Sequence, residues 1–468
     1  MKQHISRRKF LGLTAAATAG GLAVACQPQV VEKAVPVTQI VQVKETVQVK
    51  ETVEVQKEVV ITATPPPAAE PVNLRLAEGS WVGPEGIKFW TDDIIARFEL
   101  ENPGIKITYE SAESDDYQDK LYTQAVAGDA PDVFFIWWSG GLMEKGQLLP
   151  LDEYFNKEYL ADFYPGNVVG QVFEGKLYGI PKYISTVCLG YNKDILDEAG
   201  VKYPDGTWTW DQYLDACRKC TKREADGTIT QWGTYTEYTY LFHWIWMNGG
   251  EWMDADLFGT KALFNEPKAL EALQYNYDNI YGKEPVSPMS GSIPDMGWWN
   301  VFSSGKIAFM ESHSWTVTNY IRENGFKWDF TDLPKANDGK KAGLTFTNGY
   351  SAYNGTKHKE ESVKLITFLT SPWAAKAMCL GILGLQPARR SMAEVWDKSS
   401  MGAVAGHDVA AFNRIMETAR LTPEFKDSQQ ISEILTPIWD QIWVTGETPL
   451  KDGVDLACQR INEHFGSA

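Results

Sequence analysis

The chain has 468 residues, with 44 Lys and Arg against 61 Asp and Glu, which gives a formal net charge of −17. This acidic balance argues against a nucleic-acid-binding protein, because such proteins neutralise phosphates with Lys and Arg. The hydrophobic fraction of 44% and the six scattered cysteines exclude a mostly disordered chain and a disulfide-stapled scaffold, so a folded protein of up to about three domains is expected.

The first 26 residues are predicted to be an export signal. Arg7 and Arg8 precede an apolar stretch from Leu11 to Ala25, which is shorter than the roughly 20 residues that span a membrane. A twin arginine in this position is typical of the twin-arginine export route. The stretch ends in Leu22-Ala-Val-Ala-Cys26, which resembles a bacterial lipobox. Cys26 is therefore expected to carry lipid, and the alternative is an ordinary cleavage site just before this cysteine.

Residues 27–71 are predicted to be a spacer between the lipid anchor and the folded body. The hexapeptide Val41-Gln-Val-Lys-Glu-Thr46 recurs at residues 47–52 and loosely at residues 53–58, so Val stands on alternate residues. This period of two suits an extended chain, which is either a solvated stalk or a ribbon that pairs with itself. A run of three prolines from Pro65 stiffens the end of the spacer.

The chain after the spacer alternates strands and helices. Residues 72–77 alternate at period two and predict a strand, and apolar residues at helical spacing predict a helix over 87–98. A second strand is predicted over 105–109 and a second helix over 117–125. The unbroken apolar run 133–137 is typical of a parallel strand that is covered on both faces. This order predicts a doubly wound α/β lobe.

Two further strands lead out of this lobe. Residues 176–181 and 187–191 predict strands that cross into a second lobe. A helix is predicted to start at Trp210, because Thr209 can cap its first turn while Gln212 reaches back to the cap. Two α/β lobes joined by crossing strands are therefore expected. The expected boundaries are residues 72–183 and 328–371 for the first lobe, and residues 184–327 and 372–468 for the second.

The sequence offers little for catalysis or metal binding. Its six histidines include no pair at metal-ligand spacing, and no nucleophile-elbow, P-loop or dinucleotide-binding glycine motif occurs. Asp254 and Asp256 are interpreted as a solvated turn rather than a calcium loop. Cys217 and Cys220 lie within a predicted helix and are interpreted as structural or as a local disulfide. We expect no catalytic residue, metal or cofactor, although a glycosidase carboxylate pair is not excluded by counting acids.

Aromatic residues stand where ligands bind in α/β proteins. Trp81 follows the first predicted strand, and Trp137 and Trp138 follow the third, at the carboxyl ends where such sheets take ligands. Further aromatic residues stand near loops or helix starts of the second lobe: Tyr183, Tyr238, Tyr240, Trp244 and Trp315. Flat apolar rings with polar rims suit sugars. The alternative for any single Trp is core packing, to which Trp90 and Trp439 are assigned because they lie on apolar helix faces.

Five motifs occur in a characteristic order between residues 72 and 395. They are Gly128-Asp-Ala-Pro-Asp-Val-Phe134, Gly175-Lys-Leu-Tyr-Gly-Ile-Pro181 followed by Leu189 to Asp194, Thr207-Trp-Thr-Trp-Asp211, Phe302-Ser-Ser-Gly-Lys-Ile-Ala-Phe-Met310 with Trp315 five residues later, and Gly384-Leu-Gln-Pro-Ala-Arg389. Together they resemble the family 1 extracellular solute-binding proteins, the maltose-binding-like receptors of ABC importers. The resemblance implies a two-lobe periplasmic-binding-protein fold, in which two mostly parallel sheets flanked by helices are joined by a multi-crossing hinge.

The same resemblance implies which residues line the cleft between the lobes. On the first lobe they are Glu78, Ser80, Trp81, Trp138 and Ser139. On the hinge and the second lobe they are Tyr183, Tyr238, Tyr240, Trp315, Gly349, Tyr350 and Arg389. Arg389 is expected to form bidentate bonds to ligand hydroxyls or to a phosphate. The family binds its ligands without catalysis, so the resemblance implies a receptor rather than an enzyme.

The leading hypothesis is a lipid-anchored, monomeric sugar receptor on the outer face of the cell membrane. Closure of the hinge would bury the sugar, and the closed form would be recognised by an ABC transporter permease. One alternative is an exported glycoside-cleaving enzyme. Another is a receptor for a solute that is not a sugar, such as glycerol phosphate, a polyamine or an amino acid derivative, although the negative net charge disfavours an anionic ligand.

Overall fold

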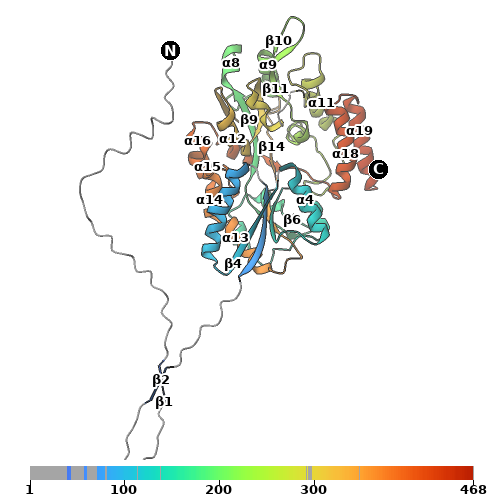
Figure 1. Cartoon of the computed structure of the whole chain (residues 1–468). Coiled ribbons are helices and arrows are strands. Elements are labelled where there is room, and N and C mark those ends of the chain that lie inside the picture. Colours follow the sequence, from blue (N-terminus) through green and yellow to red (C-terminus); the bar gives the residue numbers. More distant parts are fainter. Residues whose placement is uncertain are drawn as a thin grey trace, which may run out of the picture. The chain divides into compact units, whose positions relative to one another are not determined.

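The computed structural model describes residues 40–43, 57–60, 71–79, 82–112, 114–137, 139–290, 292, 298–346 and 348–466. The twin arginine, the lipobox cysteine Cys26 and the proline run lie outside this part. The chain divides into two units, Met1–Glu70 and Pro71–Ala468. In the first unit, strands β1 (Ile40–Val43) and β2 (Lys57–Val60) pair antiparallel, so the described part of the spacer forms a ribbon (Figure 1).

Apart from one two-stranded hairpin, the described residues of the second unit form two sheets, of which the first has the strand order β4-β3-β5-β15-β8. Its strands are β3 (Val72–Gly79), β4 (Ile105–Ala112), β5 (Val133–Ile136), β8 (Ile180–Pro181) and β15 (Gly349–Ala352). β3 runs parallel to β4 and β5, and β15 runs antiparallel to β5 and β8. All four residues of β5 are buried, as the continuous apolar run predicts for a strand covered on both faces.

Helices cover both faces of this first sheet. They are α2 (Gly83–Lys88), the π-helix η1 (Phe89–Ile95), α3 (Ala96–Glu101), α4 (Ser114–Ala127), α5 (Gly140–Glu144), α6 (Lys157–Leu160), α7 (Pro165–Val169), α13 (Lys359–Leu369) and α14 (Pro372–Leu380), with a small hairpin of β6 (Val172–Phe173) and β7 (Lys176–Leu177). The helices predicted over 87–98 and 117–125 are confirmed. Trp90 is 1% exposed and belongs to the core of this lobe, as its position on an apolar helix face predicts.

The second sheet has the strand order β10-β11-β12-β9-β14-β16, with β13 also paired to β9. Its strands are β9 (Ser185–Asn192), β10 (Lys222–Arg223), β11 (Ile229–Tyr235), β12 (Ile307–His313), β13 (Trp328–Thr331), β14 (Gly343–Phe346) and β16 (Ala419–Leu421). β11 is parallel to β12, and β14 is parallel to β16. The crossing strand β9 is antiparallel to its partners β12, β13 and β14.

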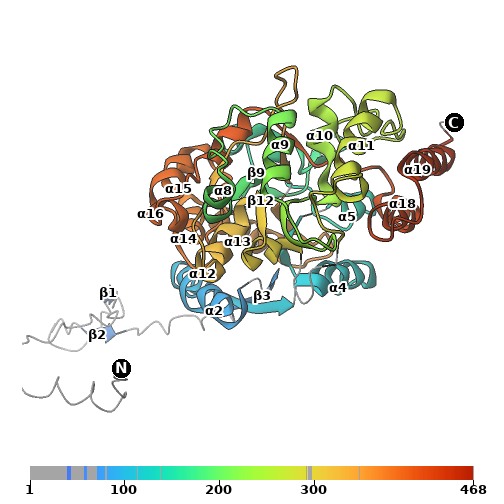
Figure 2. The same ribbon diagram turned by 90° about the horizontal axis from the view of Figure 1, so that it is seen from above.

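The second sheet is also packed between helices. They are α8 (Lys193–Ala199), α9 (Trp210–Cys220), η2 (Tyr238–Tyr240), α10 (Phe242–Met247), α11 (Pro267–Tyr281), η3 (Trp298–Ser304), η4 (Ser314–Thr316), α12 (Val317–Glu323), η5 (Arg390–Met392), α15 (Ala393–Ser399), α16 (Met401–Val404), α17 (Ala411–Arg414), η6 (Ile415–Glu417), α18 (Ser428–Trp443) and α19 (Leu450–His464). Figure 2 shows α15 and α16 on one side of this unit and α18 and α19 on the other. α9 begins with the predicted capping box of Thr209 and Gln212. None of the helices in the described residues has the length and apolar character that membrane crossing requires.

In the part of the chain that the structure describes, the backbone crosses between the lobes three times. The first crossing joins β8 to β9, and the second joins β14 to β15. The expected return to the first lobe at residue 328 instead follows Phe346, because β13 and β14 pair within the second sheet. The third crossing, expected at residue 372, comes later, because α14 and Ala388 pack in the core of the first lobe. Backbone hydrogen bonds tie the crossings together, since Lys182 N–H donates to Asn348 and Ile184 N–H donates to Gln386.

Candidate functional site

The carboxyl ends of parallel strands in both lobes lie beside the hinge crossings. In the first lobe these are the ends of β3 and β5, and in the second lobe the ends of β11 and β12. The hydroxyl of Ser314, directly after β12, donates to the carbonyl of Ile184 in the first crossing at 3.2 Å. Ligands of open α/β sheets bind outside such strand ends. We call this region, with its side chains from both lobes, the inter-lobe site.

Two of the predicted aromatic residues meet on the first-lobe side of this site. Trp137 follows β5 and Tyr183 lies in the first crossing, and both are half-buried. Their ring centroids lie 5.7 and 5.8 Å from the ring of the buried Phe135, which stands between them. Ser139 is buried, and its hydroxyl lies 4.0 Å from the Met143 sulfur of its own helix. Three further predicted ligand residues lie outside the described residues: Ser80, Trp81 and Trp138.

Two more predicted aromatic residues meet on the second-lobe side. Tyr240 follows β11 in η2 and Trp315 follows β12 in η4, and both are half-buried. The ring of His313 joins them, at 5.6 Å from Tyr240 and 5.4 Å from Trp315, and Phe346 packs beneath Tyr240 and His313 at 5.0 and 5.1 Å. Burial and the neighbouring His243 lower the pKa of His313 to about 3, so this imidazole is neutral at physiological pH.

Acidic residues stand beside this aromatic group, and the sequence analysis missed them. Glu237 follows β11 and accepts hydrogen bonds from the backbone N–H of Thr239, at 3.1 Å, and from the Thr239 hydroxyl. Burial raises the pKa of Glu237 to about 7. Glu311 accepts from Trp244 Nε1 at 2.6 Å and lies 3.2 Å from His243 Nε2. Among 61 acids, the only signal for Glu237 is its place between a strand end and the run Tyr238-Thr-Tyr240.

Glu78 and Tyr350 were expected to face the ligand, and the structure places both in the core. The Glu78 carboxylate is fully buried and accepts from Lys182 Nζ at 2.8 and 2.9 Å and from the Tyr350 hydroxyl. The Lys182 ammonium lies 4.2 Å from the ring centroid of Phe135. Burial raises the pKa of Glu78 and lowers the pKa of Lys182, and the attraction between the two charges opposes both shifts. The pair is therefore part of the core that supports the inter-lobe site, and it does not contact a ligand.

The side chain of Arg389 is also committed to the protein. Its Nε donates to the carbonyl of Thr370 at 2.7 Å and its Nη1 to Asp162 Oδ2 at 3.0 Å. The guanidinium lies 4.3 Å from the ring centroid of Phe163. The residue is 6% exposed, so in this arrangement its guanidinium is not available for the bidentate ligand contact that was expected of Arg389.

Three more residues that were expected to contact a ligand are packed against other side chains of the protein. Trp244 is 3% exposed and stacks on Tyr275 at 5.4 Å within the core of the second lobe. The ring of Tyr238 stacks on Trp443 of α18 at 6.1 Å, away from Tyr240. Gly349 is covered by Gln171, whose Nε2 would lie 2.6 Å from an added Cβ atom. Each of the three is therefore explained by packing.

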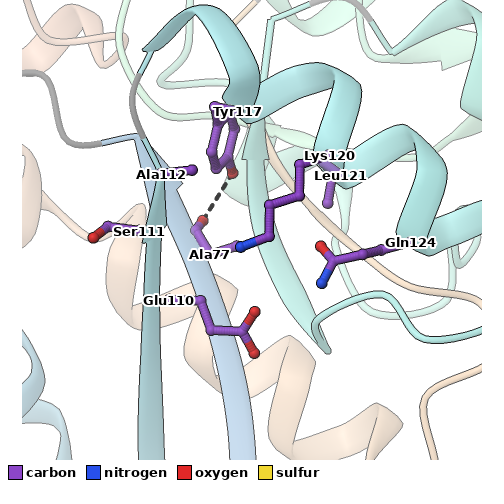
Figure 3. Close-up of a pocket in the computed structure, with 8 residues that line it drawn as sticks. All are labelled: Ala77, Glu110, Ser111, Ala112, Tyr117, Lys120, Leu121 and Gln124. Carbon is purple, nitrogen blue, oxygen red and sulfur yellow. Dashed lines mark hydrogen bonds between the residues drawn. The ribbon is translucent and has the colours of Figure 1, made fainter.

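A small pocket at the carboxyl end of β4 is too small for a sugar. Figure 3 shows its lining residues, which come from β3, β4 and α4: Ala77, Glu110, Ser111, Ala112, Tyr117, Lys120, Leu121 and Gln124. Its volume of about 10 Å³ is about that of one water molecule. The Tyr117 hydroxyl donates to the carbonyls of Ala77 and Phe135 at 3.0 and 2.8 Å. The pocket is therefore part of the support of the first sheet.

The described residues offer no evident metal or thiol chemistry. Within them, no group of three or more His, Cys, Asp and Glu side chains is placed to hold a metal ion. Asp256, considered for a calcium loop, pairs with Arg420 at 2.7 Å. Cys217 and Cys220 are free and buried rather than joined in a disulfide, and burial raises the pKa of Cys220 to about 12. A thiol in this state is inert.

Comparisons with known proteins agree with this architecture. Residues 83–376 match the family described as bacterial extracellular solute-binding proteins. A binding protein of Brucella abortus is 28% identical over 376 residues, which cover 78% of this chain and 88% of the relative. The arabinooligosaccharide-binding protein of Halalkalibacterium halodurans is 26% identical over 330 residues, which cover 66% of this chain and 72% of that protein.

A solved structure shows the same two-lobe fold. The ABC substrate-binding protein of Listeria monocytogenes in complex with cycloalternan aligns with a TM-score of 0.75 and 24% identity, over 85% of this chain and all of that chain. These proteins are described as binding proteins, and the description of the family indicates an extracytoplasmic location. The match to the family covers more than half of the chain. The chain therefore belongs to the bacterial extracellular solute-binding proteins.

Proposed function

We propose that this protein binds a carbohydrate between its lobes and delivers it to the permease of an ABC transporter. The observation that carries the proposal is that half-buried aromatic rings stand beside the hinge on both lobes, with Trp137 and Tyr183 on one side and Tyr240 and Trp315 on the other. Such rings stack on the C–H faces of sugars while their polar rims hydrogen-bond to hydroxyl groups. Relatives named for arabinooligosaccharide and cycloalternan binding support the same ligand class.

The charges around the site favour an uncharged ligand over glycerol phosphate. Lys182 is neutralised by Glu78, and Arg389 is neutralised by Asp162. The described neighbours of Tyr240 and Trp315 include the acid Glu237, and the neutral His313 adds no positive charge. An anion in this region would meet negative potential.

A binding role is also better supported than hydrolysis. Glycosidases need two carboxylates that flank the scissile bond and are available to it. Glu237 bonds to Thr239, and Glu311 bonds to Trp244, so both carboxylates beside the site are engaged by their own lobe. Turnover of a chromogenic glycoside by the purified protein would favour the enzyme alternative.

We further propose that the protein is a monomer on the outer face of the membrane, held by lipid on Cys26 after twin-arginine export. The apolar stretch before Cys26 is too short to span a membrane, and its end resembles a bacterial lipobox, which supports a lipid on this cysteine. The ribbon of β1 and β2 lies between this cysteine and the body and would act as part of the spacer.

A thermal-shift screen tests the proposed ligand class. Neutral mono- and oligosaccharides, glycerol phosphate and polyamines are added to the purified protein, and the melting temperature is recorded. A ligand at about 100 times its Kd adds roughly 2.7 kcal/mol to the free energy of unfolding. Stabilisation by a neutral sugar is expected. Stabilisation by glycerol phosphate alone would contradict the proposal.

A further inference from the structure

The two lobes also touch at a place outside the hinge crossings. There α5 of the first lobe faces residues 424–429, which include the end of the connection after β16 and the start of α18 in the second lobe (Figure 2). Glu144 Oε1 of α5 accepts the backbone N–H of Asp427 at 3.0 Å, and Lys145 Nζ lies 3.5 Å from Gln429 Oε1. Each of these contacts joins a group of one lobe to a group of the other, so it exists only while the two lobes touch.

The carboxylate of Glu424 lies at the centre of this contact. This carboxylate approaches the backbone of Gly140 in the first lobe. The approach is so close that a Cβ atom added to Gly140 would lie 2.4 Å from Glu424 Oε1. Glu424 is partly exposed, and its carboxylate packs against the backbone of the other lobe.

We propose that Glu424 and α5 form a proton-dependent clasp between the lobes, so that closure takes up a proton and low pH favours the closed form. Burial raises the pKa of Glu424 to about 7, and the negative charge of Glu144 acts in the same direction. Separation of the lobes would hydrate the carboxylate and return its pKa toward the ordinary value of about 4.3. The raised pKa belongs to the form in which the lobes touch here, which we take as the closed form, so closure gains stability as the pH falls below about 7 and loses it above.

Of the other charged groups around Glu424, Glu144 would add to the effect, whereas His464 would not. The pKa of Glu144 is also raised by burial, and the charges of Lys145 and Lys426 oppose this rise. Protonation of Glu144 at low pH would therefore act in the same direction as protonation of Glu424. His464 Nε2 pairs with Asp427 Oδ2 at 3.0 Å, but both residues belong to the second lobe, so opening does not separate them.

The proposal can be tested without any ligand. Fluorescent labels are attached through cysteines introduced at Glu153 of the first lobe and Lys219 of the second, which are exposed, whereas the native cysteines of the described residues are buried. Energy transfer in the full-length protein is measured from pH 8.5 to pH 5. A rise toward low pH is expected, and Glu424→Gln should reduce it strongly. Glu433→Gln changes an exposed glutamate of α18 and should keep the original profile.

A pair of neighbouring glycines gives a second, steric test. Gly140→Ala should displace the Glu424 carboxylate and lower the energy transfer at all pH values, whereas Gly141→Ala should not, because its Cβ atom would lie 3.4 Å from Tyr122 in ordinary contact. A pH profile that is the same in Glu424→Gln and in the original protein would overturn the clasp. So would equal energy transfer in Gly140→Ala and Gly141→Ala.

The affinity readout rests on the proposed function, whereas the energy-transfer readout does not. If a sugar binds the closed form, its affinity should rise by up to about 30-fold from pH 8 to pH 5.5, as the two pKa values require. Glu424→Gln should flatten this dependence. Energy transfer that depends on pH, in a protein that binds no sugar, would support the clasp and contradict the proposed ligand. The two failures can therefore be told apart.

Discussion

Lys182→Met should strongly destabilise the protein, because it leaves Glu78 buried without its counter-charge. The side chains of the pair are 1% and 0% exposed, and both carboxylate oxygens accept from the ammonium. Loss of one partner of such a pair costs about 3–5 kcal/mol of the free energy of unfolding. In the variant the ammonium no longer opposes the effect of burial, which raises the pKa of Glu78. The variant should therefore regain stability as the pH is lowered and the carboxyl group is protonated.

Urea unfolding of the ligand-free protein measures this effect. The double variant Glu78→Gln with Lys182→Met should recover much of the loss, because it removes both charges together. Lys451→Met is the matched control, since Lys451 pairs with Asp455 at 2.5 Å but is 67% exposed, and its loss should cost less than about 1 kcal/mol. A cost for Lys182→Met as small as that of the control, or a double variant no more stable than the single one, would refute the reasoning.

Three further predictions concern the anchor, the export route and the corrected arginine. Cys26→Ala should release the protein from membranes with unchanged sugar affinity, and a variant that resists a carbonate wash would contradict lipidation. Arg7→Lys combined with Arg8→Lys should stop export, as measured by cell fractionation, and normal export would indicate a plain secretory signal. Arg389→Gln should lower the melting temperature, because its charged hydrogen bonds to Thr370 and Asp162 are worth roughly 1.5–3 kcal/mol each; a large loss of sugar affinity at unchanged stability would return Arg389 to the site.

The local structure follows from the sequence wherever one pattern decides it. The period of two over 72–77, the apolar run 133–137 and the capping box at Thr209 each predict the element that the structure shows. The lobe boundaries depend on pairing between distant segments. β13 and β14 have four residues each, and only their pairing with β9 assigns them to the second sheet, so local periodicity does not reveal their lobe.

The same distinction applies to the inter-lobe site. Trp137 is predicted because it follows a strand of the first lobe, and Tyr183, Tyr240 and Trp315 are predicted because they stand near loops or helix starts and fit the family resemblance. Glu78 also stands at a strand end, but its partner Lys182 is 104 residues away, and burial of the two together is a property of the folded core. Position along a strand therefore predicts which residues reach this edge of the sheet. It does not predict which of them turn inward to satisfy a buried charge.

Calorimetric titration of Trp315→Ala with a sugar found in the thermal-shift screen tests the central claim most directly. Loss of the half-buried indole should weaken binding by about 2 kcal/mol, or about thirtyfold in Kd, as for aromatic anchors generally. The ligand-free melting temperature should change little. Trp396→Ala is the control, because Trp396 is 1% exposed and its loss should destabilise the fold by roughly 3–5 kcal/mol without weakening binding to the folded protein. Unchanged affinity of Trp315→Ala together with a large drop in its melting temperature would place Trp315 in the core and contradict the site.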